Sequence, residues 1–350
     1  MPIQRILVVG SHLGYVQHMD EGLIHGFAEI GCEVASFDYR ASSLTPNWLR
    51  RLIPHGIRHR LSPRRLSSVE RMDRLVSNNH FTARLNDVRP QLVVSLQAER
   101  LSAESIKSAA ELGAVTMNWI GDEPWRNVPP AIVSAYDIWM VIDPTWGPWL
   151  VERGARRVEH LAVACDPLVH RPVTLNEAAR ERWRSRLCFV GGYGENRERI
   201  LASVADMGLS IWGPGWEQAK QPELRQCVRQ SRMLTREEWQ QAFAAAEVVL
   251  NIHAQGQECL NMKVFEALSA EVCLLSDYKR DLDRVLNGVV ASFRDEAELR
   301  HQCKLLLASV ERRRSLAQLG RKEVLQRHTF AHRARQMREW AESAREMKAS

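Results

Sequence analysis

Several features that define common protein classes are missing from this 350-residue sequence. No segment approaches the roughly 18 consecutive apolar residues of a membrane-spanning helix, and the apolar run after MPIQR is too short for a signal peptide. The seven cysteines are scattered, contain no Cys-x-x-Cys pair and are odd in number, which disfavours a zinc site or a disulfide framework. We therefore expect buried thiols in a cytoplasmic protein, with peripheral contact to the inner face of a membrane as a further option.

The sequence also lacks a pattern of metal ligands. There is no Asp-x-Asp between two apolar runs, and the histidines are dispersed, so we expect no bound metal and no cofactor. What is present is an ordinary soluble mixture, 45% hydrophobic and 26% charged. A chain of this length suits two domains, each large enough to bury a core.

One stretch, NIHAQGQECLNMKVFEALSAEVCLLSD at residues 251–277, organises the second half of the chain. Apolar runs typical of buried parallel strands lie at residues 248–250 and 272–275. Between them, Met262, Phe265 and Leu268 recur at helical spacing, which predicts a helix that begins near Asn261. In such a unit, the loop and the helix N-terminus lie at the carboxyl edge of a parallel sheet and favour an anion such as a diphosphate.

Two carboxylates and a lysine lie in this stretch. Glu258 precedes the predicted helix. Glu266 lies on that helix, about two turns away from Glu258, so the two carboxylates could straddle one ligand. An ionised carboxylate accepts hydroxyl hydrogen bonds and therefore suits a sugar, whereas Lys263 could neutralise phosphates. This pattern predicts a site for a sugar that carries a diphosphate.

The same stretch resembles the Glu-x7-Glu region of GT-B glycosyltransferases of the GT4-like type. Together with LCFVGGYGENRERI, IWGPGW, FRDEAELR and QRHTFAHRARQM, it is similar to the CgeB-like (spore maturation protein) group over residues 187–338. The resemblance implies that Glu266 binds the nucleotide ribose, that Glu258 lies near the donor sugar, and that the reaction retains the anomeric configuration. One departure, Ala270-Glu271 in place of a small residue and Gly, leaves the geometry of the phosphate pocket open.

The resemblance also implies an architecture. We expect an α/β protein with the GT-B fold, in which two Rossmann-like domains present parallel sheets to a central cleft. Residues 1–170 would form the acceptor-binding domain and residues 171–328 the nucleotide-sugar-binding domain. Residues 329–350 would form a helix that crosses back toward the N-terminal domain.

The candidate donor-binding residues cluster where predicted strands end. Three glycines in the loop after the strand at residues 187–190 let the backbone approach a ligand, and Arg197 could fork onto a phosphate or remain a solvent-exposed helix residue. By resemblance, the GPGW loop lies near the nucleotide base. The full set is Gly191, Gly192, Tyr193, Arg197, Gly213, Gly215, Trp216, Asn251, His253, Asn261, Lys263 and Glu266.

The first half opens with a buried strand, a Gly-rich turn and a helix, ILVVGSHLG followed by residues 17–30, as in a Rossmann-like unit. Its Gly-x3-Gly spacing is not the dinucleotide fingerprint, which disfavours nicotinamide binding. Gly10, Ser11 and Gly14 are candidates for acceptor binding. His12 is a candidate general base, with a hydrogen-bonded structural residue as the alternative.

A second loop of the first half, NWIGDEPW, resembles the corresponding loop in CgeB-like proteins. Asp122 could take a proton, and Glu123 could bind acceptor hydroxyls. The alternative is helix capping ahead of Pro124. The predicted catalytic residues are thus His12, Asp122 and Glu258.

Residues 46–90 carry ten arginines against three acidic residues. This region, from Arg50 to Arg89, could contact an anionic lipid, a phosphorylated acceptor or nucleic acid. The alternative is a pair of amphipathic helices with solvated arginines.

These observations predict a metal-independent glycosyltransferase that moves a sugar from a UDP- or other nucleotide-sugar to an unknown acceptor. The acceptor could be a saccharide, a small molecule or an anionic polymer such as modified DNA. Three alternatives remain: a nucleotide-sugar epimerase or phosphorylase of the same fold, a non-catalytic nucleotide-binding partner of another transferase, and a nucleic-acid-binding protein that uses the Arg-rich region.

Overall fold

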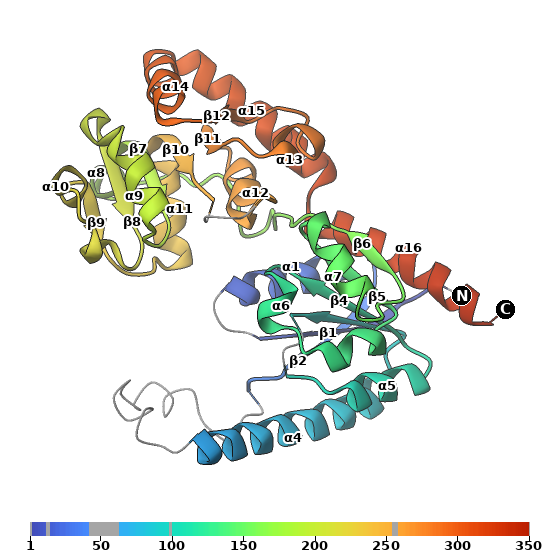
Figure 1. Ribbon diagram of the computed structural model, residues 1–350. Coiled ribbons are helices and arrows are strands. Elements are labelled where there is room, and N and C mark those ends of the chain that lie inside the picture. The colour runs from blue at the N-terminus through green and yellow to red at the C-terminus, as the bar shows by residue number, and fades with distance from the viewer. Residues whose placement is uncertain (1, 12–14, 42–62, 98–99, 254–257, 350) are drawn as a thin grey trace. The chain divides into compact units, whose positions relative to one another are not determined.

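The computed structural model describes residues 2–11, 15–41, 63–97, 100–253 and 258–349. The chain divides into two compact units, and each is a sheet flanked by helices (Figure 1). The first unit comprises Met1–Leu161 and Phe330–Ser350, and the second comprises Ala162–Thr329. All seven cysteines are buried free thiols, as the sequence predicts.

The first unit holds six strands, all from its N-terminal segment, and its last helix comes from the C-terminal end of the chain. The strands are β1 (Arg5–Gly10), β2 (Glu33–Asp38), β3 (Leu92–Leu96), β4 (Val115–Ile120), β5 (Ile138–Val141) and β6 (Val158–His160). The helices are α1 (Tyr15–Glu29), α4 (Pro63–Val88), α5 (Ala103–Glu111), α6 (Pro124–Asn127), η1 (Pro130–Ala135), η2 (Pro144–Trp146), α7 (Gly147–Val151) and α16 (Phe330–Ala349).

The strand order of the first sheet is β2-β1-β3-β4-β5-β6, and every neighbouring pair is parallel. The chain runs outward from β1 to β2 and then returns to the other side of β1 for β3. The order therefore reverses between β1 and β3. In open α/β sheets, the carboxyl ends of the strands at such a reversal form the usual ligand crevice.

Helix α16 packs on α1 through two glycines (Figure 1). A β-carbon on Gly22 would overlap the ring of Phe330, and one on Gly26 would lie 2.5 Å from the Phe330 backbone. Helix α16 also contacts the start of the chain, because Ile3 N–H donates to Glu342 Oε1 at 2.9 Å. The last helix is thus an integral part of the first unit.

The second unit repeats the pattern with six further strands. They are β7 (Ser185–Val190), β8 (Leu209–Trp212), β9 (Val228–Gln230), β10 (Ala246–Asn251), β11 (Leu274–Asp277) and β12 (Ala291–Phe293). The helices are α8 (Glu177–Trp183), α9 (Glu195–Ala202), η3 (Ala205–Met207), η4 (Trp216–Gln218), α10 (Pro222–Arg225), α11 (Arg236–Ala244), α12 (Met262–Ser269), α13 (Arg280–Arg284), α14 (Glu296–Ala308) and α15 (Val310–Arg327).

The second sheet has the order β12-β11-β10-β7-β8-β9, again parallel throughout. The chain passes from β7 outward to β9 and then crosses to the other side of β7 for β10. The reversal lies between β7 and β10, so the loops after these two strands flank the crevice. Two six-stranded parallel sheets confirm the predicted α/β class with two Rossmann-like domains.

Local signals in the sequence account for most helix boundaries. Asn261 caps α12, and its Oδ1 accepts from the Val264 N–H at 3.3 Å. A capping box opens α11, where Thr235 and Glu238 stand at the Thr-x-x-Glu spacing typical of this motif and bond each other's backbone N–H groups. Residues 144–151 form two short helices, η2 and α7, with Pro148 near the junction, where it cannot donate a backbone hydrogen bond.

The Arg-rich region is described only in part. Residues 42–62 lie outside the described residues, and the remainder includes one 26-residue helix, α4. No helix in the described part of the chain is both long and apolar enough to span a bilayer.

Candidate functional site

The candidate site of the second unit lies at the carboxyl ends of β7, β10 and β11. Asn251 ends β10, and its Nδ2 donates to Ser276 Oγ in β11 at 3.0 Å. Asn261 Nδ2 in turn donates to Asn251 Oδ1 at 3.1 Å. The predicted residues Asn251 and Asn261 therefore meet, and they join the end of β10 to the start of α12.

His253 lies beside this pair. Its Nδ1 is 2.6 Å from Asp277 Oδ1, and its Nε2 accepts the backbone N–H of Asn261 at 3.2 Å. Because Nε2 is an acceptor, the proton of the neutral ring lies on Nδ1 and is donated to Asp277. Both ring nitrogens are used within the protein, so His253 acts on the site through Asn261 and Asp277.

Lys263 reaches from the first turn of α12 to the sheet edge, where its Nζ donates to the carbonyl of Val190, the last residue of β7. Burial lowers the pKa of Lys263, the charge of Arg197 lowers it further, and Glu266 opposes the shift. The structure thus places a lysine between the two loops that flank the strand reversal.

Glu266 is one turn further along α12 and is 8% exposed. Burial raises the pKa of Glu266 above its ordinary value of 4.5, and the positive charges of Lys263 and Arg236 oppose this shift. Its Oε1 lies 3.4 Å from Nε2 of His170. The sequence gives no sign of His170, because this residue lies in a segment without periodicity between β6 and α8.

Arg197, at the start of α9, ties the two loops together. Its Nε donates to Ile252 O at 3.0 Å and its Nη1 donates to Gly192 O at 2.9 Å. Burial lowers the pKa of Arg197, and the charge of Asp277 opposes the shift. The arginine therefore links the loops after β7 and β10 by its charged side chain, and its role toward a phosphate stays a prediction.

The glycines of the β7 and β8 loops allow two backbones to touch. Gly213 has φ +139°, and a β-carbon there would overlap the Gly191 carbonyl group. Trp216, which is fully buried, donates from Nε1 to the same carbonyl at 2.8 Å. At Gly215, where φ is +86°, a β-carbon would lie 3.1 Å from the Tyr193 β-carbon. Trp216 thus supports the loops from inside the core, where it is not available to stack on a base.

Tyr193 makes a polar contact away from the crevice. Its hydroxyl donates to Glu198 Oε2 at 2.8 Å, and Glu198 Oε1 accepts the backbone N–H groups of Lys220 and Gln221. This network fixes the loop after β8 against α9.

Glu258 is not held near Glu266 by any described contact. Its side chain is 72% exposed and lies 3.8 Å from Nζ of Lys279. Residues 254–257 lie outside the described residues, and Glu258 is the first described residue after them.

In the first unit, Gly10 ends β1 opposite Asp38 of β2. A β-carbon on Gly10 would overlap the carboxyl group of Asp20, which comes from α1 and is fully buried. Ser11 is also buried, and its backbone N–H donates to Asp20. Sequence analysis missed Asp20, although it lies directly against the predicted glycine turn. His12 and Gly14 lie outside the described residues.

The loop after β4 carries the other first-unit candidates. Asp122 Oδ2 accepts from Gln97 Nε2, at the end of β3, at 3.3 Å. Loss of hydration around the carboxyl group raises the pKa of Asp122, Glu123 adds to the shift and Arg126 opposes it. Glu123 Oε2 is 3.0 Å from Arg126 Nε, and its side chain makes no capping hydrogen bond to α6. Asp122 follows β4, and Asp20 lies against Gly10 at the end of β1. Both carboxyl groups are therefore at the carboxyl edge of the first sheet.

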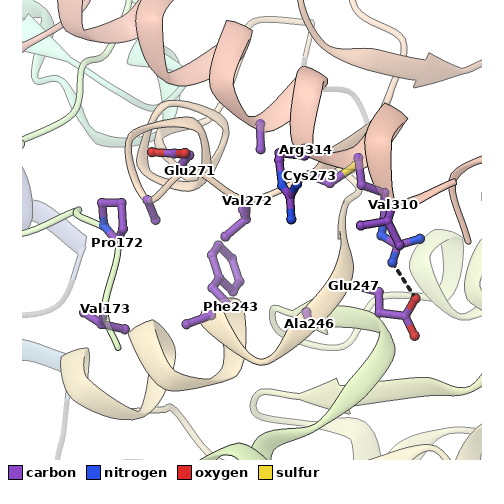
Figure 2. Close-up of a pocket in the computed structure, with 14 residues that line it drawn as sticks. Pro172, Val173, Phe243, Ala246, Glu247, Glu271, Val272, Cys273, Val310 and Arg314 are labelled. Atoms are coloured by element: carbon purple, nitrogen blue, oxygen red, sulfur yellow. Dashed lines mark ion pairs between the residues drawn. The ribbon is translucent and has the colours of Figure 1, made fainter. Parts of the chain in front are cut away.

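A pocket of about 270 Å³ lies at the opposite, amino-terminal ends of β10 and β11 (Figure 2). It is lined by Pro172, Val173, Phe243, Ala244, Ala246, Glu247, Ala270, Glu271, Val272, Cys273, Val310, Arg313, Arg314 and Ala317. Figure 2 shows the ion pair between Glu247 and Arg313, whose atoms are 3.0 Å apart. This pocket does not include the predicted donor residues.

Within the part of the chain that the structure describes, no group of three or more His, Cys, Asp or Glu side chains is placed to hold a metal ion.

The chain is similar to known proteins in part of its sequence and in its fold. Residues 196–339 match a family model described as "Glycosyl transferase-like". No curated protein matches the chain in sequence. The solved structure of sucrose-phosphate synthase from Thermosynechococcus elongatus is similar over 99% of this chain and 100% of that chain, with a TM-score of 0.64 and 14% identity.

Two further solved structures are similar. One is a trehalose-6-phosphate synthase from a study of glycosyltransfer with retention, with a TM-score of 0.61 and 10% identity over 97% of this chain and 99% of that chain. The other is apo OtsA, with a TM-score of 0.61 and 11% identity over the same shares. At these identities the likeness shows the fold, which is GT-B with two Rossmann-like domains. Residues 196–339 therefore match a glycosyl transferase-like domain, and they do so within a chain that has this fold.

Proposed function

We propose that this protein transfers a sugar from a nucleoside diphosphate sugar, bound by the second unit, to an acceptor bound by the first. The observation that carries the proposal is Glu266, a buried carboxyl group beside Lys263 at the strand reversal of the second sheet. A carboxylate accepts the hydroxyls of a ribose, and a neighbouring ammonium group balances phosphate charge. The resemblance of residues 187–338 to the CgeB-like group supports the same proposal.

The charge of the departing nucleoside diphosphate would be balanced without a metal. Lys263 and Arg197 supply two partly buried positive charges near the ends of β7 and β10. The N-terminus of α12, which begins in the same loop, supplies backbone N–H groups and a positive dipole end. Charges fixed in place before the reaction stabilise a leaving group without reorganisation.

Retention at the anomeric carbon is the second part of the proposal. It is supported by the resemblance of Glu258 and Glu266 to the Glu-x7-Glu pair, and by the similarity to a trehalose-6-phosphate synthase described as acting with retention. Asp122 would serve the acceptor, since it follows β4 at the carboxyl edge of the first sheet and loss of hydration raises its pKa, which favours a proton-accepting role.

The first experiment is a thermal-shift screen of nucleoside diphosphates and their sugars, because a bound ligand raises apparent stability by mass action. The best donor is then tested for transfer to an acceptor panel, with and without a metal chelator, and the product anomer is assigned by NMR. Consumption of the donor without an acceptor would indicate an epimerase. Binding without any reaction would indicate a non-catalytic partner.

The role of Glu266 is tested by calorimetry. Glu266→Ala should weaken binding of the nucleoside diphosphate by about 1.5–3 kcal/mol, the range for losing hydrogen bonds to a charged group. Glu181→Ala serves as the matched control, because this glutamate is in the same unit and its side chain is 79% exposed. Equal affinities in the two variants would remove Glu266 from the donor site.

A further inference from the structure

His170 is a buried histidine that no sequence motif marks. Its side chain is 4% exposed and lies in the segment between β6 and α8. The edge of its ring packs against Trp239 of α11, with centroids 5.6 Å apart and planes at 72°. The ring is therefore held in one orientation.

The protonation of this ring follows from its neighbours. The backbone N–H of Asp166 donates to His170 Nδ1 at 3.2 Å, so Nδ1 is an acceptor. The same turn is closed by the His170 N–H, which donates to Asp166 O at 2.7 Å. A neutral imidazole that accepts at Nδ1 carries its proton on Nε2. That N–H lies 3.4 Å from Glu266 Oε1 and is the group available to donate to it.

A second contact joins His170 to the same helix. Ser269, one turn after Glu266 on α12, donates from Oγ to the carbonyl of His170 at 2.5 Å. The segment thus contacts α12 through its backbone at Ser269 and through its ring at Glu266. The approach of His170 Nε2 at 3.4 Å is a polar contact and not yet a formed hydrogen bond; among the described residues no side chain hydrogen-bonds to the Glu266 carboxylate, and 11% of the Glu266 side chain stays exposed.

We propose that His170 is a positioning residue of the nucleotide-sugar site, which holds Oε1 of Glu266 so that Oε2 faces the ribose hydroxyls of the donor. This inference rests on the proposed function. The carboxylate is otherwise a flexible side chain with two equivalent oxygens. A single fixed donor on one oxygen selects one rotamer and leaves the other oxygen for a hydroxyl pair, which lowers the entropy cost of binding.

The experiment compares two substitutions at this position. His170→Phe keeps the ring against Trp239 and removes the donor, whereas His170→Gln restores an N–H near the position of Nε2. Binding is measured by calorimetry with the tightest-binding member of UDP, GDP, ADP, CDP and dTDP, and with the 2′,3′-dideoxy form of the same nucleotide. Thermal unfolding of each variant is recorded in parallel.

The wild-type protein should prefer the hydroxylated nucleotide. His170→Phe should weaken its binding about ten-fold, the loss of one hydrogen bond to a charged group. The affinity of His170→Phe for the dideoxy nucleotide should differ from that of the wild type by less than about two-fold. His170→Gln should recover most of the affinity for the hydroxylated nucleotide. A merely structural role would weaken both nucleotides equally.

The outcomes separate the two proposals. If the wild-type protein binds a nucleoside diphosphate and His170→Phe binds both forms as the wild type does, the positioning role is wrong and the proposed function stands. If His170→Phe fails to fold, His170→Gln decides. An equal loss of affinity for the hydroxylated and the dideoxy nucleotide in that variant also overturns the positioning role. If the wild-type protein binds no nucleoside diphosphate or nucleotide sugar, both proposals fail.

Discussion

Nδ1 of His253 lies 2.6 Å from Oδ1 of Asp277, a contact between the ends of β10 and β11. The opposite ring nitrogen accepts the N–H of Asn261, the cap of α12. One buried imidazole therefore fixes two strand ends and a helix N-terminus in a single arrangement. This geometry makes His253 a support of the candidate donor site, which is a different role from direct contact with a sugar or a phosphate.

We expect His253→Ala to lower the free energy of unfolding. The substitution leaves the Asn261 N–H without its partner and removes one hydrogen bond to Asp277 Oδ1, which still accepts the backbone N–H of residue 253 at 3.1 Å. A buried group left unsatisfied costs about 1–3 kcal/mol. His301→Ala is the control, because His301 is an exposed histidine of the same unit. Urea unfolding followed by tryptophan fluorescence measures both variants. Equal stabilities would show that the imidazole contacts contribute nothing to the fold.

Much of the fold could be predicted because the signals are local. Buried parallel strands appear as short apolar runs, such as residues 248–250, and their order along the chain fixes which loops meet at the carboxyl edge. Asn and Thr are favoured at helix N-caps, so Asn261 and Thr235 indicate where two helices begin. The same logic placed Asn251, Lys263 and Glu266 at one sheet edge, where the structure also has them.

Other features could not be read because they depend on contacts between distant residues. His170 meets Glu266 only after α12 packs against the segment that follows β6, and a single histidine in an irregular segment gives no periodic signal. Asp20 meets Gly10 through the packing of α1 on β1. Strands β9 and β12 are three residues long, too short for a period of two to show.

The stability of the first unit should fall as pH rises because of Asp20. Burial raises the pKa of Asp20 from 3.8 to about 8, and the charges of Asp38 and Glu21 add to the shift. Between these two pKa values, the folded state holds a proton that the unfolded state has lost. The free energy of unfolding therefore decreases with pH over this window, by up to about 1.4 kcal/mol per pH unit from this group.

Asp20→Asn tests this dependence, since an amide of the same shape keeps the packing against Gly10 without ionising. The variant should be more stable than the wild type near pH 8, and the difference should shrink toward pH 4. Urea titrations at several pH values measure it. A difference that does not change with pH would assign the effect of the substitution to packing alone.

The glycine contact between the β7 and β8 loops should be sensitive to one methyl group. Gly213→Ala introduces a β-carbon that overlaps the Gly191 carbonyl, at a backbone φ of +139°. We expect a loss of about 2–4 kcal/mol, because strain and overlap add. Gly288→Ala is the control: its φ is +67°, but its nearest neighbour is at an ordinary 3.6 Å, so about 1 kcal/mol of backbone strain remains. Equal losses would mean that the loop relaxes and the contact is not rigid.

Glu271 occupies the position where the CgeB-like pattern has glycine, and the structure shows how the chain accommodates it. The residue has φ +57°, so the turn between α12 and β11 keeps the left-handed geometry despite the side chain. It lies at the end of α12 opposite to Asn261 and lines the pocket of Figure 2.

Glu271→Gly should raise the free energy of unfolding by about 0.5–1 kcal/mol. Relief of left-handed strain contributes about 1 kcal/mol, and loss of the partly exposed ion pair with Arg321, whose atoms are 3.5 Å apart, costs a fraction of that. Glu271→Ala loses the same ion pair but keeps the β-carbon, so the difference between the two variants isolates the backbone. Affinity for the nucleoside diphosphate should be the same in both, because the substitution is far along α12 from the phosphate end. If the glycine variant were no more stable than the alanine variant, the turn would carry no strain, and the left-handed backbone at Glu271 would cost the protein nothing.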